Sequence, residues 1–137
     1  MKPTETTQFS ARLDADLVAR LKASSARDGV SASQLAERYI DEGLRSEEFP
    51  GIVFRSGPVG RRAGLTGGPD VWEIIRDVRA AREAAIADPV STVAAASELT
   101  AAQVRLAGAY YTAYPDEVDA RIAADQELAE KLLASGM

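Results

Sequence analysis

The chain has 137 residues and a mass of 14.6 kDa, which is enough for one ordinary domain or two small ones. Hydrophobic residues make up 46% and charged residues 27%, and no apolar run approaches the roughly 18–20 residues of a membrane-spanning helix. The chain has no cysteine and no histidine, which excludes disulfides, thiolate nucleophiles, Ser-His-Asp triads and the usual zinc sites. We therefore expect no enzyme, no cofactor and no metal. Residues 1–7 are polar and have no signal-peptide core, which favours a cytoplasmic location.

Charge is distributed unevenly along the chain. The formal net charge of −5 and the pI of about 4.8 argue against indiscriminate binding to nucleic acid, because such binding needs a basic surface. Residues 1–46 carry seven basic and seven acidic side chains, whereas residues 47–122 carry eight and eleven and residues 123–137 carry one and three. Any DNA contact is therefore expected from a small patch in the N-terminal part.

The first segment alternates between polar and apolar residues. Over residues 6–13 this period of two predicts a half-buried strand with Gln8, Ser10 and Arg12 on its polar face. Asp14 suits an N-cap, and a helix is expected from there to about Arg27, ended by Asp28-Gly29.

A second helix is expected to follow at once. Ser31 and Gln34 have the spacing of a capping box, in which each side chain accepts a hydrogen bond from the other residue's amide. The helix should run to about residue 44 and bury its apolar side chains, namely Leu35, Ala36, Tyr39, Ile40 and Leu44.

One strand and two short helices are too few to fold alone, because units below about 40 residues usually need help. A lone strand also leaves both edges unpaired. We therefore predict an obligate homodimer in which two strands pair antiparallel about a two-fold axis. The alternative for Gln8, Ser10 and Arg12 is that they form the solvated face of a purely structural ribbon.

The order of strand, helix, Gly-x-Ser and helix, with Gln8, Phe9 and Arg12 in the strand, resembles the ribbon-helix-helix repressors of the Arc/MetJ/CopG type. The resemblance implies that the paired strands lie in the major groove, which admits a two-stranded ribbon. Arginine pairs with guanine and glutamine with adenine. The residues that would read base edges are Gln8, Ser10 and Arg12. The amides that would hold a phosphate are those of Ser31, Ala32 and Ser33.

The pattern of the remaining residues predicts a hairpin followed by helices. Strands are expected over residues 51–55 and 61–65 with a turn between them, and Asp70 should cap the next helix. Trp72 is expected to anchor the core rather than to bind a ligand. Helices are expected over 71–87, 90–97, 101–113 and from 115 onward, with breaks at Asp88-Pro89 and Tyr114-Pro115.

This order suggests a small winged-helix-like fold, so the chain as a whole is expected to be mostly α with short β. The second region resembles the helix-turn-helix domain of unknown function family 433, which occurs in VapB-like antitoxins encoded beside a PIN-like nuclease toxin. The segments that carry the resemblance are 51–55, 60–63, 67–73 and 110–119. The sequence departs from the commoner hairpin of that family at Gly60–Ala63. The expected organisation is a dimerisation and DNA-binding domain, a linker, a hairpin plus helix-turn-helix domain and a helical tail, over 1–46, 47–50, 51–122 and 123–137.

Two further sets of residues are candidate contacts. Arg55, Arg61 and Arg62 on the hairpin could touch phosphate or an acidic partner, or could be solvated charge. The tail is expected to continue the last helix and to lay leucines on a partner surface, as acidic antitoxin tails do. These are Leu128, Leu132 and Leu133. The alternative is a frayed surface helix.

These features favour a DNA-binding antitoxin of a type II toxin–antitoxin pair, which neutralises a PIN-like toxin and represses its own operon. Its partners would be double-stranded operator DNA, a second copy of itself and the toxin. One alternative is a stand-alone ribbon-helix-helix transcriptional regulator. Another is a dimeric protein-interaction module, with weak, sequence-blind DNA binding that vanishes as salt rises. The DNA-binding interpretation depends on residues 6–13 of two copies lying side by side.

Overall fold

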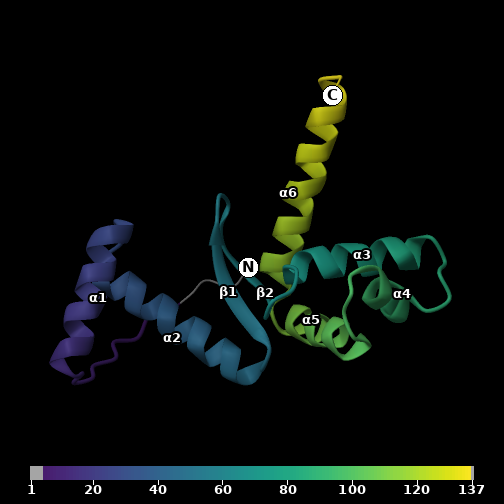
Figure 1. Ribbon diagram of the computed structural model, residues 1–137. Helices are drawn as coiled ribbons and strands as arrows, with labels where there is room; N and C mark the ends of the chain where they lie inside the picture. The colour runs from purple at the N-terminus through teal and green to yellow at the C-terminus, as the bar shows by residue number, and fades with distance from the viewer. Residues whose placement is uncertain (1–4, 137) are drawn as a thin grey trace. The chain divides into compact units, whose positions relative to one another are not determined.

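A computed structural model describes residues 5–136 (Figure 1), so residues 1–4 of the expected first domain and residue 137 of the tail lie outside the described part. As expected, the chain is mostly helical with a short two-stranded antiparallel sheet. It divides into two compact units, Met1–Asp41 and Glu42–Met137, called here the N-terminal and the C-terminal unit. Within residues 5–136, every helix is too short or too polar to cross a membrane.

Helix α1 spans Ala15–Asp28, close to its predicted bounds. Asp14 stands at the N-cap, although its side chain makes no capping hydrogen bond. Gly29 ends the helix in the left-handed conformation (φ 68°), which glycine adopts without steric cost, and its amide donates to the Ser25 carbonyl.

Helix α2 spans Ala32–Glu48 and starts at the predicted capping box. The Gln34 amide donates to Ser31 Oγ at 3.1 Å, and the Ser31 amide donates to Gln34 Oε1 at 3.3 Å. The helix continues past its expected end near Leu44, so residues 47 and 48 are helical and not part of a linker.

The predicted strand over residues 6–13 is wrong for the single chain. Residues 5–14 belong to no helix or strand, and all of them are exposed. The physical reason is that a strand needs a hydrogen-bonded neighbour, and the two strands found within residues 5–136 pair with each other.

The predicted burial along α2 is also largely wrong for the single chain. Only Leu35 is buried, at 1% exposure, and Ala36 is half-buried. The other three side chains, Tyr39, Ile40 and Leu44, are exposed. Helix α1 buries none of its residues. Apolar periodicity identifies the face that a helix offers, but burial needs a second layer that covers that face.

The C-terminal unit contains the predicted hairpin. Strands β1 (Ile52–Gly57) and β2 (Gly60–Leu65) are antiparallel, in a register that runs from Ile52 opposite Leu65 to Gly57 opposite Gly60. Two residues, Pro58 and Val59, form the turn.

Four helices complete this unit: α3 (Val71–Glu83), α4 (Pro89–Ala96), α5 (Ala101–Ala113) and α6 (Pro115–Ala134). Helix α3 packs against the other three and against β2, around a core that includes Ile52, Leu65, Ile74, Val104 and Tyr110. Helix α5 begins at the predicted position, where Thr100 and Gln103 form a capping box. Helix α3 ends before the expected Ala87, in a turn where Ala85 has a positive φ of 56°. The predicted continuation of α6 into the tail is confirmed as far as Ala134.

The end of α2, from Glu42 onward, is part of the C-terminal unit, and polar contacts of Arg45 connect it to α5 and α6. Arg45 Nη1 donates to Tyr110 Oη at 2.9 Å, and Tyr110 Oη donates to Glu117 Oε1 at 2.8 Å. Arg45 also forms an ion pair with Glu117. Burial and the hydrogen bond to Glu117 raise the pKa of Tyr110 far above its ordinary value, so the phenol keeps its proton and remains a donor.

Candidate functional site

The three side chains predicted to read base edges are free of intrachain structure. Gln8, Ser10 and Arg12 are exposed, and within the described residues no hydrogen bond or ion pair connects them. The single chain therefore does not bring them together on one face. Their predicted alignment depends on strand pairing, which one chain does not provide.

The amides predicted to hold phosphate lie at the start of α2. The Ser31 amide is already engaged, because it donates to Gln34 Oε1. The amides of Ala32 and Ser33 belong to the first helical turn, whose N–H groups have no partner inside a helix. The anion-binding capacity at this helix start is therefore smaller than predicted.

The three hairpin arginines do not form one cluster. Neighbouring residues of a strand point to opposite faces, so Arg61 is separated from Arg62. Arg61 donates to Glu42 through Nε at 2.9 Å, and to Ser56 Oγ at 2.9 Å. Arg55 and Arg62 share the other face, where they stand directly opposite each other in the register.

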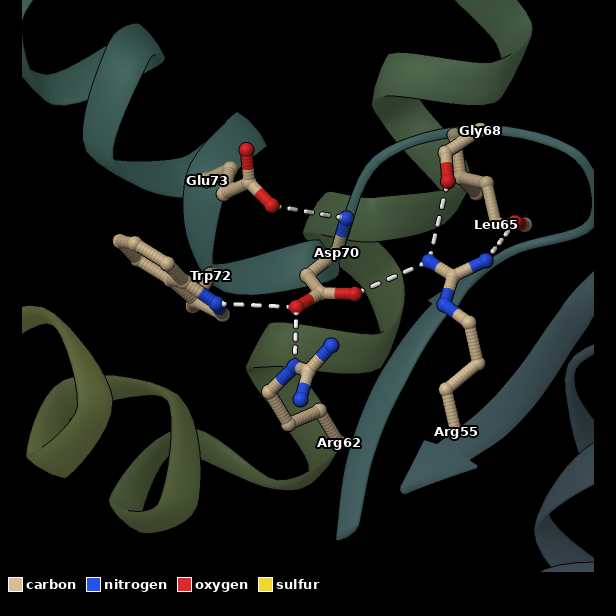
Figure 2. A network of polar contacts seen from close by, with 7 residues as sticks. All are labelled: Arg55, Arg62, Leu65, Gly68, Asp70, Trp72 and Glu73. Atoms are coloured by element: carbon tan, nitrogen blue, oxygen red, sulfur yellow. Dashed lines mark hydrogen bonds and ion pairs between the residues drawn. The ribbon is translucent and has the colours of Figure 1, made fainter. Parts of the chain in front are cut away.

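A buried carboxylate joins Arg55 and Arg62 (Figure 2). Like charges that face each other across two strands are destabilising unless an opposite charge compensates them. Asp70, at 6% exposure, accepts from Arg55 Nη2 on Oδ1 at 3.0 Å and from Arg62 Nε on Oδ2. Trp72 Nε1 donates to the same Oδ2 at 3.2 Å. One acid therefore binds both strands of the hairpin to the start of α3.

Arg55 also closes the loop between β2 and α3. It donates to the carbonyls of Leu65 at 3.1 Å and Gly68 at 2.9 Å. Gly64 makes room for this guanidinium, because a Cβ at that position would lie 1.8 Å from Arg55 Nη2. Asp70 donates its own amide to Glu73 Oε1 at 3.4 Å, at the N-terminus of the helix.

The electrostatics of this network are those of a structural ion pair. Burial alone would raise the pKa of Asp70, but hydrogen bonds from Arg62 and Arg55 outweigh it and lower the pKa below its ordinary value. A carboxylate that is held ionised with its lone pairs occupied is poorly suited to accept a proton from a substrate. The contacts of Asp70 therefore hold the hairpin against the start of α3.

A cavity of about 410 Å³ lies beside the network, within the C-terminal unit. It is bordered by the hairpin, the start of α3 and α6, and its lining includes Val59, Ala63, Trp72, Val118, Arg121 and Ala124. The volume falls within the range of ligand pockets. Trp72 was expected in the core; it packs against the core and also lines this cavity. The guanidinium of Arg121 lies 4.8 Å from the centre of the Trp72 ring.

Sequence reasoning missed the cavity and the role of Asp70. The only available signal for Asp70 was a pair of arginines on two adjacent strands with a single acid at the next helix start. At the start of α6, Glu117 forms an ion pair with Arg45, and Asp119 forms one with Arg79. Nowhere in residues 5–136 do three or more potential metal ligands gather.

Comparisons with known protein families, with curated proteins and with solved structures find no match for this chain.

Replacing Asp70 by asparagine should lower the free energy of unfolding by about 2–4 kcal/mol, because it leaves two facing arginines without their shared anion. The loss should fall short of that for a fully buried pair, since the arginine side chains are 33% and 23% exposed. Urea unfolding monitored by circular dichroism measures it. Asp77→Asn, which breaks an exposed pair with Arg76, serves as the control and should cost less than about 1 kcal/mol.

The loss of unfolding free energy in Asp70→Asn should also depend on pH. The folded-state pKa of Asp70 is lowered, so its contribution is complete above the unfolded-state pKa of about 3.9 and is lost as pH falls below it. The difference in unfolding free energy between the natural chain and Asp70→Asn should stay constant from neutral pH to about pH 5 and shrink below about pH 4. A difference that shrinks already between pH 7 and 6 would contradict this assignment.

Proposed function

We propose that this protein is a homodimeric ribbon-helix-helix DNA-binding protein that serves as the antitoxin of a type II toxin–antitoxin pair and represses its own operon. The observation that carries the proposal is the set of large apolar side chains that the N-terminal unit leaves exposed. Its members come from the first segment and from both helices: Phe9, Leu13, Leu17, Tyr39 and Ile40.

These exposed apolar side chains support the presence of a second chain that covers them. Isolated helices shorter than about 12–15 residues are marginal in water, and α1 has 14 residues with none buried. Phe9 is 81% exposed and Ile40 is 55% exposed, although both are side chains that normally pack in cores. A second copy would cover both helices and would give residues 6–13 the strand partner that the single chain lacks.

The chemistry of the paired segment favours DNA. Alternation would then turn Phe9 inward and Gln8, Ser10 and Arg12 outward. Arginine and glutamine are the side chains that bind guanine and adenine edges through two hydrogen bonds. The N-terminal residues are also the part of this acidic chain that phosphate repels least. Phosphate contacts would come from the start of α2, through the amides that its capping box leaves unoccupied.

The C-terminal unit supplies the proposed partner-binding part. We propose that this unit is a small winged-helix-like domain followed by a helical tail. The leucines Leu128, Leu132 and Leu133 are exposed on that tail. In the proposal these leucines bind a PIN-like toxin. Because Arg55 and Arg62 are bound to Asp70, the hairpin arginines are weaker candidates for this contact than the tail.

Replacing Ile40 by glutamate should break the contact between the two N-terminal units and convert the dimer to monomer, because a charge at this apolar position cannot be buried without a partner. Sedimentation velocity measures the change. Ile86→Glu, at a comparably exposed apolar position in the C-terminal unit, should leave the dimer intact. A monomeric natural chain would contradict the dimer directly.

Replacing Arg12 by alanine should weaken binding to the DNA upstream of the protein's own gene by about 1–3 kcal/mol per lost guanine contact and relax specificity at that base. Titration of labelled duplex at fixed salt measures it. Arg105→Ala removes the same charge from an exposed position of α5 and should have little effect. Equal affinity for the natural chain and Arg12→Ala would remove base readout and favour the interaction module.

Co-expression with the product of the adjacent gene tests the toxin assignment. A toxin that co-purifies with the natural chain should be lost from the triple variant Leu128→Glu, Leu132→Glu, Leu133→Glu, because charges at these exposed positions oppose an apolar contact. If no neighbour co-purifies while DNA binding persists, the function is that of a stand-alone regulator.

A further inference from the structure

Helix α2 belongs to both compact units and is continuous through the boundary between them. That boundary lies between Asp41 and Glu42, inside the helix. The part of α2 before the boundary has one buried side chain, Leu35, whereas the part after it contacts α5 and α6 through Arg45. The two parts of the same helix are therefore stabilised by different contacts.

A glycine lies directly after this boundary. Gly43 is an interior residue of α2, where glycine lowers the stability of a helix about fivefold relative to alanine. Its φ is not positive, and a Cβ added at this position would lie in open space. Neither a left-handed conformation nor a close approach therefore requires glycine here. Its effect on α2 is to make the helix easier to open at this point.

Ion pairs hold α2 on both sides of Gly43. One residue before it, Glu42 accepts hydrogen bonds from Arg61 on both carboxylate oxygens, from Nε at 2.9 Å and from Nη2. Two residues after it, Arg45 forms an ion pair with Glu117. The side chains of Glu42 and Arg45 are only 12% and 20% exposed, so salt screens these pairs less than it screens pairs on an open surface. We call these two ion pairs the latch.

The latch anchors the turns from which the rest of α2 extends. Starting a helix is unfavourable by about a thousandfold, whereas adding a residue to a formed turn is close to neutral or favourable. Residues 42–48 are held in the C-terminal unit, so residues 32–41 extend a helix that already exists. Because Gly43 lies between the anchored turns and residues 32–41, a weaker latch should open the helix at this glycine.

We propose that Gly43 is a hinge in α2, which the latch holds in the helical conformation. When the two ion pairs are broken, α2 opens at Gly43 and residues 32–41 lose helical order, while the C-terminal unit stays folded around its own core. The hinge belongs to a single chain, so it depends neither on the proposed dimer nor on DNA. In the proposed dimer, opening of the hinge would lower the affinity between the N-terminal units, because the affected part of α2 carries Ile40.

Hydrogen exchange of the backbone amides of residues 36–41, resolved by NMR, measures the opening. The measurement is made on the full chain carrying Ile40→Glu, so that pairing of the N-terminal units does not contribute. Adding Glu42→Gln and Arg45→Gln together should speed exchange of these amides about tenfold, because each partly exposed ion pair contributes a few-fold to the closed state.

The matched control breaks an ion pair that does not involve α2. Arg79 in α3 pairs with Asp119, within the C-terminal unit. In the same Ile40→Glu chain, Arg79→Gln should leave exchange of residues 36–41 unchanged. Amides of the C-terminal unit, followed in the same spectra, establish that this unit is folded in every variant.

The glycine itself provides a second test. Gly43→Ala adds a methyl group in open space and improves helix propensity, so it should slow exchange of residues 36–41 about fivefold and offset part of the effect of Arg45→Gln. Gly108 in α5 is also an interior helical residue with open space for a Cβ, so Gly108→Ala is the matched control. It should leave exchange of residues 36–41 unchanged.

Two results would overturn the hinge. One is exchange of residues 36–41 that is as slow in the double variant of the latch as in Arg79→Gln. The other is a Gly43→Ala chain in which exchange of these residues slows no more than in Gly108→Ala. A natural chain that is monomeric or does not bind DNA would contradict the proposed function and would leave both of these comparisons unchanged.

Discussion

The carboxylate of Asp70 is the contact on which the C-terminal unit depends. Arg55 and Arg62 face each other across the hairpin, an arrangement that repels unless an anion lies between them. By accepting from both, Asp70 converts a repulsive pair into a connection between β1, β2 and the start of α3. Trp72 is held by the same oxygen, so the position of the cavity wall follows from this ion pair. The network also explains why two of the three hairpin arginines are unavailable as a basic patch.

The two units obtain their stability in different ways. The C-terminal unit has a core that joins both strands with α3, α4, α5 and α6. Among residues 5–41 of the N-terminal unit, Leu35 is the one large side chain that is buried, and α1 buries none. Apolar burial is the main favourable contribution to folding, at about 25 cal/mol per Å². A unit that leaves Phe9 and Ile40 in water lacks most of this contribution within its own chain, which is the physical basis for expecting a second chain there.

Local signals allowed much of the fold to be predicted. Two helix starts are marked by capping pairs whose members are three positions apart, Ser31 with Gln34 and Thr100 with Gln103. Asp88-Pro89 marks a break in the same local way, without reference to distant parts of the chain. Contacts between distant residues could not be predicted in the same way. Arg45 meets Tyr110 and Glu117 across more than sixty residues, and no periodicity indicates this. Burial of Tyr39 and Ile40 was predicted wrongly because periodicity shows which face is apolar and not what covers it. The cavity was missed because its walls come from three separated segments.

The uneven distribution of charge bears on how such an acidic protein could bind DNA. In the proposed dimer, with one arginine per paired strand, few charged side chains reach the DNA, so the affinity of a single dimer should be low and should depend only weakly on salt. Linking two binding modules raises apparent affinity through effective concentration, without any new contact to DNA. Several of the proposed dimers bound side by side on repeated half-sites would add modest contacts in this way. The acidic charge of residues 47–137 is compatible with DNA binding in this proposal, because the DNA contact is left to the neutral N-terminal part. Specificity in this arrangement comes from the repetition of a modest contact and not from the strength of any single one.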